Sequence, residues 1–284
     1  MRRLGLLRAA AISGLFAATV FATGCAKVEG AATNLAINLI ERRILPPQLA
    51  MDDVDMACRF ATGNFPLISG GTRAFNGDPS LLEAVLYTSS AVCSEKRAVE
   101  EELRYLRAAR RNQIEEAQDA RIAQKRLLEL TARRQLAGFE RMRDKLQTKY
   151  SFEYGEKCPK FERDFDEMVY LLGSVAGLQA MQNDIAAQQT VGVPTDIAPL
   201  AESALKCLNN AKWWGAPEAA RAIVWSIIPG AAQGRDIAGT FDKAMTIAES
   251  KGVRLAHVMA AMAAQSNDDS AGIRAAIKRF TSVA

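Results

Sequence analysis

The chain has 284 residues, of which 49% are hydrophobic and 24% charged, a composition typical of globular proteins that excludes bulk disorder. Its single histidine, His257, excludes a metal site with two histidine ligands from one chain. Without the three arginines of the first 24 residues, 33 basic residues stand against 32 acidic ones. A chain so close to neutral is not expected to bind nucleic acid.

The first 24 residues have the pattern of a bacterial signal peptide. A basic start, MRRLGLLR, precedes the apolar run AAAISGLFAATVFATG, which is too short to span a bilayer stably. The junction Ala22-Thr23-Gly24-Cys25 resembles a lipobox, in which the cysteine thiol accepts diacylglycerol before cleavage. We predict a mature chain that starts at Cys25 and is acylated there; a plain secretory signal is the alternative. Because Ala26 is not aspartate, the resemblance implies a lipid-anchored protein on the periplasmic side of the outer membrane.

The chain after Cys25 is predicted to be helical, with short breaks. Apolar spacing over residues 34–44 indicates an amphipathic helix, which Pro46-Pro47 should end. A second helix is expected from Asp52 or Asp53 to Ile68, before Gly70-Gly71.

Asp78-Pro79 is a strong signal for the start of the next helix, with aspartate as N-cap and proline in the first turn. No glycine or proline occurs from Ser80 to Ala137, and residues 94–149 contain 15 Lys/Arg and 10 Asp/Glu in 56 positions. This charged segment should therefore be helical almost throughout. Unbroken, it would extend about 84 Å, whereas a compact domain of this size has a radius of gyration of about 18 Å, so it must break or protrude.

Residues 107–126 contain only Ile114 and Ile122 as large apolar side chains, while apolar stripes flank them on both sides. We therefore predict that these residues form a solvated helical arm. Most charged runs of this kind are simply a solvated face. The sharper hypothesis is a docking arm for a partner protein or for self-association into a homo-oligomer.

A loop at residues 153–160 divides the single predicted domain, residues 25–284. After it, helices are expected near residues 161–189, 197–210, 217–228, 236–250, 253–265 and 270–281. No strand-like alternation and no further run of bilayer length occurs after Cys25. The predicted fold class is all-α, built from irregular helical hairpins.

Four cysteines remain for an oxidising compartment, and two disulfides among them are plausible. Of the three connectivities, Cys58 with Cys93 is favoured, because antiparallel helices joined near residues 76–79 would bring these positions together. Cys158 with Cys207 then follows. The alternative is four buried free thiols.

No nucleotide-binding, hydrolase or zinc-protease motif is found. His257 lies among apolar residues and is expected to have a packing or interfacial role. The cluster of Asp52, Asp53 and Asp55 is explained by a helix start. No catalytic residue, metal ligand or cofactor is therefore assigned.

The best candidate for a binding surface is aromatic. Trp213, Trp214 and Trp225 surround the predicted turn Gly215-Ala216-Pro217, and tryptophan is enriched at binding hot spots. Together with Tyr170, Leu178 and Met181 on a facing helix, they are predicted to line a groove between hairpins. The alternative is that these aromatic residues belong to the core.

Several segments carry a resemblance to a known family. Leu172-Gly173 and the pair Phe241 and Ala244 match parts of the tetratricopeptide pattern. In order, FATGNFPLISGGTRAFNGDPSLLEA, MVYLLGSVAGLQAMQND, PLAESALKCL and FDKAMTIAESKGVRLAHVMAAMAAQSNDD resemble the T-component lipoproteins of tripartite ATP-independent periplasmic (TRAP) transporters. The resemblance implies tetratricopeptide-like hairpins and a non-enzymatic accessory subunit that meets a solute-binding protein. A structural or assembly lipoprotein that docks through its charged helix is the alternative.

The lipobox predicts the outcome of one substitution. Cys25→Ser should leave the precursor uncleaved or release the protein from membranes, because the acyl acceptor is lost. Membrane fractionation and the intact mass of the mature chain measure this. A Cys25→Ser chain that still partitions with membranes, together with a wild-type mass that lacks acyl groups, would contradict the prediction.

Overall fold

The structure is a computed structural model that describes residues 28–51 and 53–283. The predicted signal peptide, Cys25 and Asp52 lie outside these residues. Within them the chain is all-α, with ten helices if residues 28–49 are counted as one, packed as adjacent antiparallel pairs, and no strand, which confirms the predicted fold class. None of the described helices is long and apolar enough to cross a membrane.

The described chain begins with a continuous helical segment, residues 28–49, here called the N-terminal helix. It comprises an α-helix over residues 28–39, a π-helical turn η1 (Ile40–Ile44) and α2 (Leu45–Leu49). The prediction that Pro46-Pro47 ends this helix is wrong. After the π turn the two prolines occupy the first turn of α2, where an N–H is not needed.

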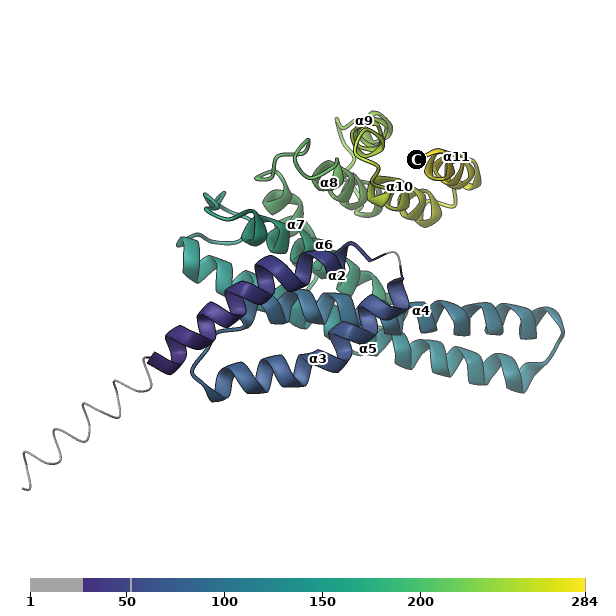
Figure 1. The fold of residues 1–284 in the computed structure, drawn as a ribbon. Coiled ribbons are helices and arrows are strands. Elements are labelled where there is room, and N and C mark those ends of the chain that lie inside the picture. The colour runs from purple at the N-terminus through teal and green to yellow at the C-terminus, as the bar shows by residue number, and fades with distance from the viewer. Residues whose placement is uncertain (1–27, 52, 284) are drawn as a thin grey trace, which may run out of the picture.

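The remaining helices follow in chain order (Figure 1). Their bounds are α3 (Val54–Ala74), α4 (Ser80–Arg110), α5 (Ile114–Tyr150), α6 (Asp164–Ala186), α7 (Ile197–Leu205), α8 (Ala216–Ile227), α9 (Ile237–Glu249), α10 (Leu255–Ser266) and α11 (Ser270–Ser282).

Helix α3 contains Pro66 and continues past its predicted end near Ile68, through Gly70-Gly71. It stops only where the Gly77 N–H donates to the Thr72 carbonyl, 2.8 Å away. The start of α4 lies one residue later than predicted. The Asp78 carboxylate accepts from the Ser80 N–H at 3.1 Å, so it still caps the helix start.

Helices α4 and α5 form an antiparallel hairpin on which the rest of the N-terminal half packs, because α3 contacts α4 and α6 contacts both. Close approach depends on glycine. A Cβ on Gly138 of α5 would lie 2.7 Å from the Thr88 hydroxyl of α4, and one on Gly173 of α6 would lie 2.7 Å from Met142 of α5. The three helices therefore meet at backbone distance.

The charged segment both breaks and protrudes. Its break is the turn between α4 and α5, where Asn112 has φ 56° and the Gln113 N–H donates to the Ala108 carbonyl. The end of the hairpin extends beyond the other helices (Figure 1). Within residues 107–126 the buried side chains are Ala108, Ala117, Ala120 and Gln124, and the other side chains are exposed or half-buried. The prediction of a solvated arm is thus confirmed.

Two disulfides have the favoured connectivity. Cys58–Cys93 joins α3 to α4 with a Cα–Cα distance of 5.5 Å, and Cys158–Cys207 joins the loop after α5 to the turn after α7 at 5.2 Å. The alternative of four free thiols is therefore wrong. The disulfides suggest an oxidising compartment outside the cytoplasm.

Each disulfide should stabilise the fold by about 2–4 kcal/mol, because a cross-link lowers the conformational entropy of the unfolded chain. The two cross-links join cysteines 35 and 49 residues apart in sequence. We expect Cys58→Ala/Cys93→Ala to lower the free energy of unfolding by that amount in urea denaturation. Thiol titration of the unfolded, unreduced protein checks the premise. Four reactive thiols would contradict it.

Candidate functional site

The described part of the chain has an open groove of about 670 Å³ in its C-terminal third, between α9 and α11. Helix α10 contacts α8, α9 and α11 and so forms its base. The caps that start the two walls are aspartates. Asp236 accepts from the Gly239 N–H, and Asp269 accepts from the Ala271 and Gly272 N–H groups. The ends of α9 and α11 are therefore fixed by local hydrogen bonds.

The two walls of the groove differ in side-chain size. Helix α9 contributes Ile237, Phe241 and Met245 at intervals of four residues, which places them on one face of the helix. The opposite wall consists of small residues of α10 and α11: Ala260, Ala263, Ala264, Gly272, Ala275 and Ala276. The volume of the groove comes from these small side chains.

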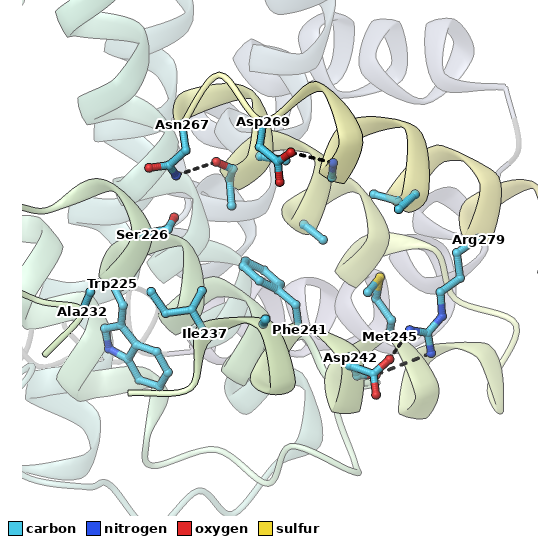
Figure 2. Close-up of a pocket in the computed structure, with 17 residues that line it drawn as sticks. Trp225, Ser226, Ala232, Ile237, Phe241, Asp242, Met245, Asn267, Asp269 and Arg279 are labelled. Carbon is cyan, nitrogen blue, oxygen red and sulfur yellow. Dashed lines mark hydrogen bonds and ion pairs between the residues drawn. The ribbon is translucent and has the colours of Figure 1, made fainter. Parts of the chain in front are cut away.

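Polar groups lie at the edges of the groove and already have partners within the protein, either another side chain or the backbone. Figure 2 shows Phe241 near its centre, the pair of Arg279 and Asp242 at one end, and Asn267 and Asp269 along another edge. The Arg279 guanidinium lies 2.6 Å from the Asp242 carboxylate, and it also pairs with Glu249. The hydrogen bond to Glu249 raises the pKa of Arg279. The groove therefore offers an apolar surface bounded by an ion pair.

Trp225 is the predicted binding residue that lines this groove. It is mostly buried, its indole N–H donates to Glu202 at 2.9 Å, and the guanidinium groups of Arg221 and Arg235 lie 4.8 and 4.5 Å from its ring centre. These contacts fix the orientation of the ring.

The other five predicted residues lie elsewhere. Trp213 is buried and donates to Glu167 of α6 at 2.7 Å, while Trp214 packs edge-on against it. Both hold the α7–α8 loop against the body. Leu178 borders a crevice of about 60 Å³ between α6, α8 and α10, and half-buried Met181 packs against the core.

Tyr170 is fully buried and does not border a groove. Its ring packs edge-on against Phe152, Tyr154 and Phe161, and burial raises its pKa. The six residues therefore do not line one shared groove. The rings of Tyr170, Trp213 and Trp214 pack against other aromatic rings, and the N–H groups of Trp213 and Trp225 are hydrogen-bonded to buried or half-buried glutamates. The residues that the prediction missed are the apolar face of α9 and the alanines facing it.

Two buried carboxylates elsewhere, Asp166 and Glu41, pair with cations. Asp166 is fully buried and bonds to the Lys149 ammonium at 2.5 Å and the Tyr150 hydroxyl at 2.6 Å. Burial, together with this carboxylate, raises the pKa of Tyr150 to about 12. Glu41 of the N-terminal helix pairs with Arg163, which stands beside Asp166. These groups join the N-terminal helix, α5 and α6.

His257 is also buried, as expected for a packing residue. Its Nε2 lies 3.0 Å from a carboxylate oxygen of Glu249, and Arg279 contacts the same carboxylate. This contact joins α9, α10 and α11 behind the groove. Among the residues described, no group of three or more His, Cys, Asp or Glu side chains is placed to hold a metal ion.

Comparisons of this chain with protein-family models, with curated proteins and with solved structures find no match. The resemblance to T-component lipoproteins therefore stays a prediction.

Proposed function

We propose that the protein is a non-enzymatic, lipid-anchored accessory subunit of a solute transport system, which binds a partner protein or an apolar solute in the groove between α9 and α11. The observation that carries this proposal is the groove itself. One wall of the groove has large apolar side chains and the other has mainly alanines. Its volume of about 670 Å³ is within the range of small-molecule sites, and an apolar groove between helices is also the kind of site that binds an amphipathic helix.

The location and partner class rest on the sequence. Acylation of Cys25 would hold the chain at the periplasmic face of the outer membrane, and the two disulfides are compatible with that compartment. The resemblance to T-component lipoproteins suggests a solute-binding protein as the partner. Genes for transporter membrane subunits and a solute-binding protein beside the gene for this chain would support that assignment.

A matched pair of substitutions on α11 tests the groove. Ala275 and Ala271 are both exposed, but of the two Ala275 alone lines the groove. Ala275→Trp should fill the groove and weaken binding of the apolar probe N-phenyl-1-naphthylamine at least tenfold, while Ala271→Trp should bind it as the wild type does. Fluorescence titration measures both affinities. Equal affinities for the two variants, or no saturable binding to the wild type, would contradict the proposal.

The exposed end of the α4–α5 hairpin favours a second candidate function, a docking arm for a complex of the cell envelope. Val99, Leu103 and Leu106 lie on one face of α4 and are each about half exposed. If this face docks a partner, Leu103→Glu should abolish co-purification with that partner, and Ala275→Trp should leave it unchanged. The opposite result would favour the groove.

A further inference from the structure

The N-terminal helix carries an apolar stripe on its outer face. Val28, Leu35 and Leu39 are 70%, 74% and 58% exposed. Their spacing of seven and four residues places all three on one face of the helix. Two arginines, Arg42 and Arg43, follow this stripe and are also exposed.

The opposite face of the same helix is fixed to the body, so the stripe cannot turn inward. Ile37 and Leu45 are buried, and Glu41 pairs with Arg163. Gly30 lies so close to the turn after α3 that a Cβ there would be 3.0 Å from the Asn76 carbonyl. The outward orientation of Val28, Leu35 and Leu39 is therefore part of the packing.

Exposed apolar side chains are concentrated in this part of the molecule. Of the 18 large hydrophobic residues that are exposed in the described chain, nine lie between residues 28 and 75, in the N-terminal helix, α3 and the short segments at the ends of α3. That range holds fewer than a fifth of the residues described. The stripe of Val28, Leu35 and Leu39 therefore belongs to the part of the described chain that is richest in exposed apolar side chains.

We infer that this stripe lies on the phospholipid surface of the membrane, with Val28, Leu35 and Leu39 at the boundary between headgroups and acyl chains. The inference rests on the proposed acylation of Cys25. Only Ala26 and Lys27 separate Cys25 from Val28, and an extended chain over these three steps reaches at most about 11 Å. The helix therefore begins next to the bilayer, and Arg42 and Arg43 are placed to reach lipid phosphates.

The cysteine chemistry of the chain allows a direct test in the full-length, acylated protein. Four cysteines are in disulfides and Cys25 would carry lipid, so a single introduced cysteine is the only site for a thiol-reactive nitrobenzoxadiazole label. Leu35→Cys places the label on the stripe. Ile277→Cys, at a 53% exposed residue of α11, and Leu103→Cys, at a 46% exposed residue of α4, are matched controls.

Labelled proteins are reconstituted into vesicles of phosphatidylethanolamine and phosphatidylglycerol that contain nitroxide-labelled lipid. We expect the label at position 35 to be quenched at least threefold more than the labels at 277 and 103. Equal quenching at the three positions, in protein that floats with the vesicles, would overturn the inference and leave the acyl anchor intact. Protein that does not float would overturn the inference together with the lipid-anchored part of the proposed function.

Discussion

A single buried carboxylate joins α3 to both helices of the α4–α5 hairpin, on which the rest of the N-terminal half packs. Glu83 of α4 is fully buried; Arg73 of α3 donates to it at 2.8 Å and Ser69 at 2.6 Å, and Arg141 of α5 lies 3.2 Å away. Burial raises the pKa of Glu83, but the hydrogen bonds from Arg73 and Ser69 and the charge of Arg141 outweigh it and hold the pKa below its usual range. The ionised form is thus the one that the fold stabilises.

The hairpin of α4 and α5 separates two kinds of surface. Its base is covered by α3 and α6, with Gly138 and Gly173 allowing close contact, whereas its end stands in solvent. The C-terminal helices are shorter. Glycines with positive φ lie in the turns before α8, α9 and α10, whereas Asp268, φ 54°, has the positive φ between α10 and α11. At Gly215, φ 78°, a Cβ would lie 2.3 Å from the Ala244 carbonyl.

Capping and composition predicted most of the fold. Helices α9 and α11 start within a residue of their expected starts at 236 and 270, and in the structure each is capped by the aspartate before it, Asp236 or Asp269. The positions where helices end were predicted less well. The prolines after Ile44 and the glycines of α3 are tolerated because a π turn and tertiary packing compensate for them, and neither is visible in local sequence.

Of the six residues predicted to line a groove, Trp225 is the one that lines the groove between α9 and α11. Tryptophan is common at binding hot spots, which is why these residues were predicted to bind a ligand. In the structure, however, the indole N–H groups of Trp213 and Trp225 donate to Glu167 and Glu202, which are 46 and 23 residues away in sequence. The groove instead results from the absence of large side chains on the faces of α10 and α11 that line it. These alanines border a groove because the tertiary fold places them opposite the large side chains of α9. Local sequence does not show which helices face each other.

The most direct test of this account is the free energy of unfolding of Glu83→Gln, measured by urea denaturation beside Glu100→Gln, at an exposed glutamate of the same helix. At pH 7 we expect Glu83→Gln to lose about 3 kcal/mol and Glu100→Gln less than about 0.5 kcal/mol. Because the pKa of Glu83 is lowered by folding, its contribution is complete above the unfolded value of about 4.3 and is lost as the pH falls through the folded value. The difference in free energy of unfolding between wild type and Glu83→Gln should therefore become smaller below about pH 4. A Glu83→Gln protein within about 0.5 kcal/mol of wild type at pH 7 would contradict the account.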